Sequence, residues 1–167
     1  MLIRMIGSIP RWDGSQKIER EDALFTGDAI ADLRTQGNTL SVWYSEDGSD
    51  LNDILVALAL NRTRIEKLCY VILDETYISN LNIHLNKIPG SAPGINNQQI
   101  LDKHRDLTEI DYWRLGLIAE HIYKRVQEDQ KRVVTKSQLE SLIRDYINNG
   151  IVDTSQLTAS IKESLRL

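Results

Sequence analysis

The chain has 167 residues, of which 41% are hydrophobic and 26% are charged, the composition of an ordinary soluble globular protein. This length suits one compact domain, or a domain with a helical appendage. The formal net charge of −4 argues against a general nucleic-acid-binding protein, and the acidic excess lies in residues 1–102, with 9 basic and 14 acidic side chains.

The first half of the chain predicts alternating strands and a helix. Residues 2–9 are apolar except for one arginine, and they predict a short buried strand. A polar stretch with a turn signal follows over residues 11–22. The Thr, Val, Trp and Tyr content of residues 39–45 predicts a second strand. Apolar positions at helical spacing then predict a helix from Leu51 to Arg64, with Ser49 or Asp50 as its cap.

Two more strands follow in the prediction. Residues 68–73 are apolar throughout and predict a central strand, within which Cys69 is expected to be a small buried hydrophobe. Residues 83–88 alternate weakly and predict a half-exposed edge strand. Two Pro-Gly pairs within residues 89–94 break regular structure.

The rest of the chain predicts helices. The first runs from Glu109 to about Asp129, with a broad apolar face that includes Trp113. The second runs from Thr135 or Ser137 to about Asn149, and the third from Asp153 or Thr154 to the end. We therefore expect an α+β or α/β fold: a small mixed sheet with one packed helix, followed by three helices. The expected parts are an α/β part over 1–88, a connector over 89–97 and a helical part over 98–167.

The polar loop before the second strand is one candidate binding site. Two carboxylates and a guanidinium, those of Asp28, Asp32 and Arg34, lie within seven residues and could bind a cation, a phosphate or a basic side chain. They could equally cap turns and form a surface ion pair. Trp12 follows Pro-Arg and precedes Asp-Gly, so we expect it to be an exposed contact, whereas Trp43 and Trp113 are expected in the core.

Three further charged residues are candidates. Asp74 and Glu75 stand where the strongest strand ends, a common place for a base or a ligand, although most strands end in polar residues. Arg4 lies inside an apolar strand, so it needs a partner or faces a cleft.

Several common sites are not indicated by the sequence. The three histidines have no zinc spacing, and there is no glycine-rich phosphate loop or nucleophile elbow. We therefore predict no metal and no cofactor. The start of the chain lacks the apolar core of a signal peptide, and no apolar run reaches about 18 residues. A cytoplasmic protein without a membrane partner is the expectation.

One order of elements resembles ADP-ribosyltransferase-like domains. The matching residues are Arg4 in the first strand, Ser41 within Leu40-Ser41-Val42, the helix around 57–59 and the strand at 70–73. In that family the arginine and the serine-containing strand help to hold NAD, and a downstream glutamate supports transfer. The resemblance implies a role for Glu109 as that glutamate, although it falls in a predicted helix and Ser41 lacks the usual small polar neighbours.

Three function hypotheses result. The first is a non-catalytic protein-binding or regulatory accessory subunit of a bacterial system, antitoxin-, immunity- or defence-like, which would bind another protein through the acidic loop and Trp12. The second is a small enzyme with the NAD-binding, ADP-ribosyltransferase-like fold. The third is a helical assembly module of a larger complex, in which the chain could also self-associate. Nucleic acid is not an expected partner of any of them.

Overall fold

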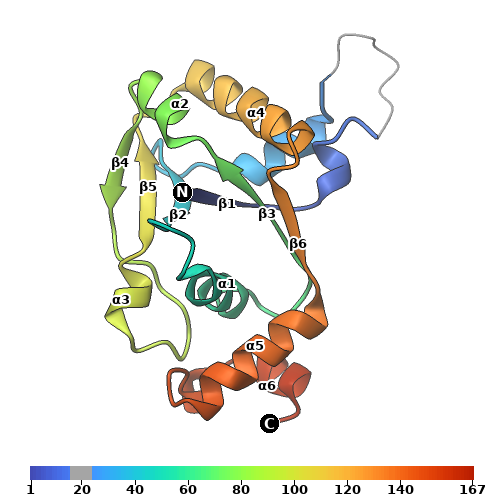
Figure 1. The fold of residues 1–167 in the computed structure, drawn as a ribbon, viewed down its shortest axis with the longest axis vertical. Helices are drawn as coiled ribbons and strands as arrows, with labels where there is room; N and C mark the ends of the chain where they lie inside the picture. Colours follow the sequence, from blue (N-terminus) through green and yellow to red (C-terminus); the bar gives the residue numbers. More distant parts are fainter. Residues whose placement is uncertain (16–23) are drawn as a thin grey trace.

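The computed structural model describes residues 1–15 and 24–167, and most of the polar stretch predicted over 11–22 lies outside this part. Six strands form one sheet in the order β4-β5-β2-β1-β3-β6, and each neighbouring pair is antiparallel. Figure 1 shows the arrangement. The strands are β1 (Leu2–Ile6), β2 (Leu40–Tyr44), β3 (Leu68–Leu73), β4 (His84–Lys87), β5 (His104–Thr108) and β6 (Lys131–Val134).

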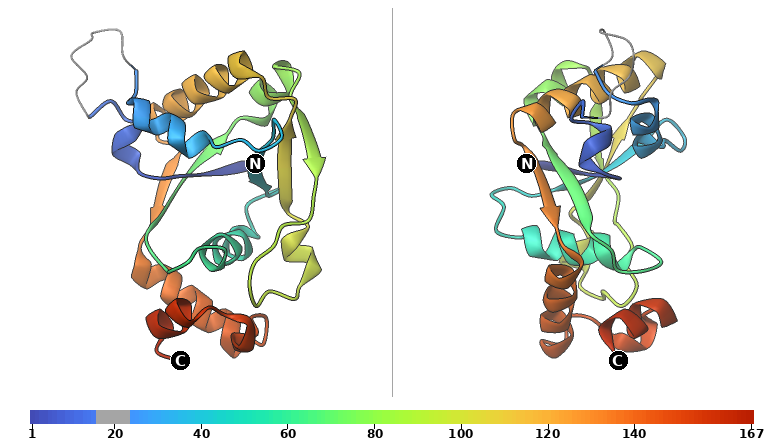
Figure 2. Two further views of the ribbon diagram at one scale, coloured as in Figure 1. Left: turned by 180° about the vertical axis from the view of Figure 1, so that it is seen from behind. Right: turned by 90° about the vertical axis from the view of Figure 1, so that its right-hand side faces the viewer.

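Helices cover both faces of the sheet. The α-helices are α1 (Leu51–Leu60), α2 (Glu75–Asn80), α3 (Gln98–Leu101), α4 (Tyr112–Gln127), α5 (Lys136–Asn148) and α6 (Ala159–Leu165). Three short 3-10 helices add η1 (Ile9–Arg11), η2 (Gly27–Leu33) and η3 (Thr154–Gln156). Figures 1 and 2 show α4 and η2 on one side of β1 and α1 on the other.

The two faces hold separate hydrophobic cores, which explains the unbroken apolar runs of β1 and β3. On β1, Leu2 and Ile6 face the core under α4 and η2, whereas Ile3 faces the core under α1, α5 and α6. Side chains alternate between the faces of a strand, so a strand covered on both faces is apolar at every position. Cys69 is buried among the α4-side residues, as predicted.

Much of the expected architecture is confirmed, and the α+β class is one such point. β4 is an edge strand and β3 an interior strand, as predicted. The expected mixed sheet is instead antiparallel at every described pairing. Two strands were not predicted: β5 and β6 lie in the region that we expected to be helical, and they pair with β2 and β3.

Some boundaries and exposures differ from the predictions. The long helix begins at Tyr112 and not at Glu109, and its first aromatic side chains, Tyr112 and Trp113, are 93% and 66% exposed. The expectation that Trp113 belongs to the core was therefore wrong, while Trp43 is buried as expected. The last helix begins at Ala159, after a separate 3-10 turn, with Thr158 as its cap.

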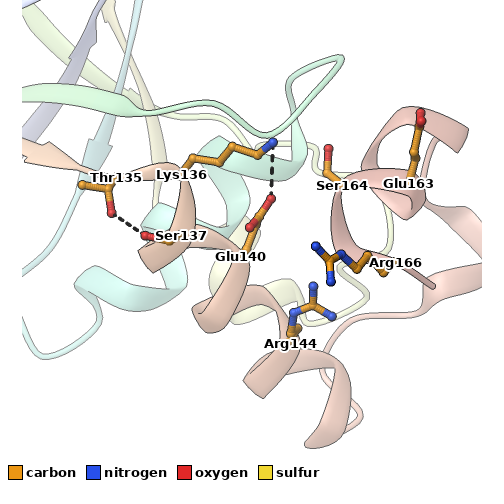
Figure 3. A pocket seen from close by; sticks show the side chains of 8 residues that line it. All are labelled: Thr135, Lys136, Ser137, Glu140, Arg144, Glu163, Ser164 and Arg166. Carbon is orange, nitrogen blue, oxygen red and sulfur yellow. Dashed lines mark hydrogen bonds and ion pairs between the residues drawn. The ribbon is translucent and has the colours of Figure 1, made fainter.

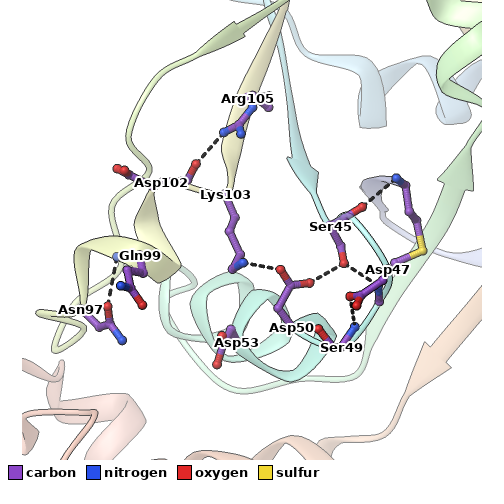
Figure 4. A network of polar contacts seen from close by, with 12 residues as sticks. Ser45, Asp47, Ser49, Asp50, Asp53, Asn97, Gln99, Asp102, Lys103 and Arg105 are labelled. Atoms are coloured by element: carbon purple, nitrogen blue, oxygen red, sulfur yellow. Dashed lines mark hydrogen bonds and ion pairs between the residues drawn. The ribbon is translucent and has the colours of Figure 1, made fainter.

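A polar network fixes the turn between β2 and α1 (Figure 4). The Asp50 carboxylate accepts hydrogen bonds from the Ser45 hydroxyl and the Lys103 ammonium group. Burial opposes ionisation of Asp50, but the hydrogen bonds from Lys103 and Ser45 outweigh it and lower the pKa of this carboxyl. The network connects the residue before α1 with the residue before β5. Both α1 and β5 contribute residues to the cavity described below.

Within the described ranges, no helix combines the length and the apolar character needed to cross a membrane.

Candidate functional site

Strands β1 and β2 are neighbours in the sheet, but they are paired only at Leu2 with Tyr44 and Ile3 with Trp43. The guanidinium of Arg4 stands at the next position. Its Nη1 donates to the Ser41 carbonyl oxygen at 2.6 Å, and its Nη2 donates to the Asp32 carbonyl oxygen. Arg4 therefore bridges the point at which β1 and β2 part.

The Arg4 side chain is buried without full compensation. Its Nε is buried and has no hydrogen-bond partner among the described residues, and no carboxylate of these residues lies within ion-pair distance of it. Burial lowers the pKa of Arg4 to about 10, against the opposing effect of the Asp32 charge. A buried cation held only by carbonyl dipoles is costly, and an anion brought to it would offset that cost.

A cavity of about 350 Å³ opens beside Arg4, on the α1 side of the sheet. Its volume lies in the range of small-molecule sites. Strands β1, β2 and β5, the end of α1 and the Pro-Gly loop all contribute to its wall. The lining residues are Ile3, Arg4, Met5, Ser41, Trp43, Leu58, Asn61, Pro89, Gly90, Ser91 and His104.

One wall of the cavity is aromatic and tightly packed. The His104 ring meets the Trp43 ring edge-on, with 5.5 Å between the ring centroids. Gly90 fits against both, since a Cβ at this position would lie 3.0 Å from Trp43 Cη2 and 3.0 Å from His104 Cβ. Of the two Pro-Gly pairs, Pro89-Gly90 lines the cavity and Pro93-Gly94 does not. The absence of a side chain at Gly90 allows the close packing of this wall.

A hydroxyl and a carboxylate face each other across β2 and β5. Ser41 is opposite Asp106 in the ladder, and its Oγ donates to Asp106 Oδ1 at 3.2 Å. His104 Nε2 lies 3.8 Å from the same oxygen, and His104 Nδ1 lies 2.9 Å from the Ile88 carbonyl oxygen. The carboxylate thus stands between the hydroxyl and the imidazole, so the order of groups is not that of a Ser-His-Asp nucleophile triad.

On the other side of Arg4, Asp32 organises a second group of contacts. Its carboxylate accepts from Gly7 N at 2.8 Å, Arg11 Nη1 at 3.0 Å and Trp12 Nε1 at 2.8 Å. A smaller cavity of about 230 Å³ lies here and shares Arg4 and Met5 with the larger one. Arg4 is therefore reached from two adjoining hollows.

The structure separates the residues of the predicted polar loop. Asp32 is nearly buried and lies beside Arg4, whereas Asp28 is exposed on η2, and Arg34 is exposed at the edge of the smaller cavity. Trp12 is fully buried, so the expectation of an exposed contact was wrong. Its indole is held inside by Phe25, at 5.2 Å between ring centroids, and by the hydrogen bond to Asp32.

The other predicted residues lie outside the cleft lining. Asp74 caps α2 by accepting from the backbone N–H groups of Thr76 and Tyr77, and Glu75 lies 3.9 Å from the N-terminal amine. Glu109 is exposed after β5, with a φ of 61°, so it is not helical, and its Oε2 lies 3.8 Å from His84 Nε2.

Sequence reasoning missed two β5 residues: His104, which lines the cavity, and Asp106, which accepts from Ser41 beside it. The signal for them was weak, because β5 contains only one fully buried residue, Leu107. A strand paired on both sides, with polar groups facing a cleft, does not show the apolar alternation that reveals most strands.

Comparison with known proteins gave no relative: no family model, no curated protein and no solved structure matches the chain.

Proposed function

We propose that the chain binds NAD at the Arg4 cleft and transfers ADP-ribose from it to an acceptor. The observation that carries this proposal is that the buried Arg4, whose Nε has no partner among the described residues, lines two cavities. A dinucleotide supplies the phosphate oxygens that an arginine binds in bidentate fashion. The adjoining hollows offer room for two parts of one elongated ligand.

The arrangement also supports the resemblance to ADP-ribosyltransferase-like domains. Arg4 and the Ser41 strand are adjacent, as that resemblance requires. The carboxylate that faces Ser41 is Asp106 and not Glu109. We therefore assign to Asp106 the part that the resemblance gave to a downstream glutamate.

The proposed step breaks the bond between C1′ of the ribose and the nicotinamide nitrogen, and the electron pair leaves with nicotinamide. The acceptor's oxygen or nitrogen then forms the new bond to C1′ and gives its proton to the Asp106 carboxylate. The same carboxylate stabilises the positive charge that develops on the ribose ring in the transition state. Trp43 offers an apolar wall on which a ring of the ligand can pack.

The test is a pair of measurements on three forms of the chain. We expect the unchanged chain to bind NAD by calorimetry and to release nicotinamide from it. Asp106→Asn is expected to keep the NAD affinity and to lower nicotinamide release by about 10²–10⁴-fold, the usual loss when a general base is removed. Glu109→Gln, the matched control just beyond the same strand, is expected to behave like the unchanged chain.

Two results would reject the assignment. NAD that does not bind would remove the function itself. A Glu109→Gln variant that loses release while Asp106→Asn retains it would show that the wrong carboxylate had been assigned.

A second function is favoured by a different observation, the exposed apolar group formed by Ile30, Tyr112 and Trp113. These side chains are 43%, 93% and 66% exposed, and they lie together on η2 and the start of α4. Exposed aromatic side chains that cluster are typical of protein interfaces. An accessory subunit would therefore bind its partner here and not through Trp12. Trp113→Ser is expected to weaken a partner complex, and unchanged affinity would argue against this surface.

A further inference from the structure

A further cavity, of about 790 Å³, lies between α5 and α6 and shares no lining residue with either cavity at Arg4. Figure 3 shows its side chains. The lining is polar and contains three cationic and two anionic side chains among its residues, which are Thr135, Lys136, Ser137, Glu140, Arg144, Glu163, Ser164 and Arg166.

Two arginines face each other in this groove. The guanidinium groups of Arg144 and Arg166 point toward one another, while the Glu163 carboxylate points away from them (Figure 3). Glu140 lies 3.5 Å from Lys136 and is therefore already paired. Among the described residues, neither guanidinium has a hydrogen-bond or ion-pair partner; the Arg166 backbone N–H donates to the Glu163 carbonyl oxygen.

Most arginines of the described part do have such a partner. Eight of the eleven donate a side-chain hydrogen bond or form an ion pair, and Arg34 is the one other arginine for which the described residues supply no partner; the eight are Arg4, Arg11, Arg62, Arg64, Arg105, Arg114, Arg125 and Arg132. Arg144 is half-buried, whereas Arg166 is exposed.

Facing cations repel one another, and their repulsion is relieved when an anion binds between them. The position of Arg166, just after α6, also neutralises the helix C-terminus, but that explanation does not apply to Arg144 inside α5. Two guanidinium forks and the hydroxyl of Ser164 match the several oxygens of a phosphate group better than the two oxygens of a carboxylate.

We propose that the groove between α5 and α6 binds a small phosphorylated ligand through Arg144 and Arg166. Its volume exceeds that of a single phosphate ion and lies within the range of sites for small molecules. On a chain with a formal net charge of −4, such a site depends on local geometry and not on the overall charge.

The experiment is a titration of the isotope-labelled full chain with sodium pyrophosphate, followed by NMR at constant ionic strength. We expect the backbone signals of residues 135–137 and 163–166 to shift in a saturable way. Arg144→Gln and Arg166→Gln are each expected to weaken this binding about tenfold or more, in line with the loss of a charge-assisted bidentate contact. Lys124→Gln removes one positive charge on the opposite side of the sheet and is expected to leave the titration unchanged.

The choice of signals separates this groove from the Arg4 cleft, since pyrophosphate bound at Arg4 would not saturate shifts at 163–166. An absence of shifts at residues 135–137 and 163–166 would overturn the proposal. Equal titration of the unchanged chain and Arg144→Gln would do the same. Shifts produced by single-stranded DNA but not by pyrophosphate would also overturn it, because they would indicate a nucleic-acid surface in place of a small-ligand site.

Discussion

At the scale of single residues, Asp32 connects two parts of the candidate site. Its carboxylate is held by Gly7, Arg11 and Trp12, while its carbonyl oxygen accepts from Arg4. The side chain thereby fixes the backbone on which Arg4 rests. Asp32 lines the smaller cavity and not the larger one, so toward the part of a ligand in the larger cavity its role is to position Arg4.

We predict that Asp32→Asn lowers the free energy of unfolding by about 1–3 kcal/mol, because the buried indole and the guanidinium of Arg11 lose an ionised acceptor. Asp28→Asn, an exposed carboxylate on the same 3-10 helix, is expected to change it by less than about 0.5 kcal/mol. Urea unfolding followed by Trp fluorescence measures both.

The positioning role has its own measurement. NAD affinity of folded Asp32→Asn is expected to fall, whereas a purely structural role would lower stability and leave the affinity of the folded fraction unchanged.

At the scale of elements, the packing around two glycines can be compared: Gly90 of the Pro-Gly loop and Gly116 of α4. Gly90 packs against Trp43 and His104, so an added methyl group would force them apart. Gly116 lies in the interior of α4, and a Cβ there would meet nothing within 4 Å.

Gly90→Ala is therefore expected to destabilise the fold by about 1–3 kcal/mol, the typical cost of overpacking. Gly116→Ala is expected to stabilise it by about 0.5–1 kcal/mol, because alanine loses less backbone entropy in a helix. Thermal unfolding of the two variants measures the difference. Equal melting temperatures would show that the cleft wall is looser than the packing indicates.

At the scale of the whole molecule, we expect one buried imidazole to contribute to the loss of stability between pH 6.5 and about 4. His121 of α4 is 6% exposed, stacks on Tyr77 and accepts a hydrogen bond from the Asp74 backbone N–H. Burial lowers the pKa of His121 to about 4, and the neighbouring charge of Arg125 adds to this shift.

The unfolded chain takes up this proton near the ordinary pKa of 6.5, before the folded chain does. The free energy of unfolding is therefore expected to fall as the pH drops from 6.5 to about 4, while the His121 contribution is constant above 6.5. His121→Gln should reduce this slope in urea titrations across the window. His84→Gln, which removes an exposed imidazole, should leave it unchanged, and equal slopes in all three forms would exclude His121 as the cause.

The elements that could be predicted from the sequence are those in which apolar residues are continuous or recur at a regular spacing. β3 is covered on both faces and is apolar throughout, and the apolar positions of α1 recur at helical spacing. Trp12 and Trp113 were assigned to the wrong environments because residue type does not reveal the partner: Trp12 finds Asp32, twenty residues away, and Trp113 finds none. Of the site, Arg4 was predictable as a charge inside an apolar strand, but Asp106 became visible only when β5 paired with β2.

The short pairing of β1 with β2 has a mechanical consequence. The sheet consists of two three-stranded halves, β4-β5-β2 and β1-β3-β6, joined by two residue pairs of β1 and β2 and by the backbone hydrogen bonds between Met1 and Ser45. Arg4 links the two halves, since it belongs to β1 and donates a hydrogen bond to the Ser41 carbonyl oxygen of β2. A ligand that engages Arg4 would therefore act where the two halves of the sheet meet and not at an outer strand.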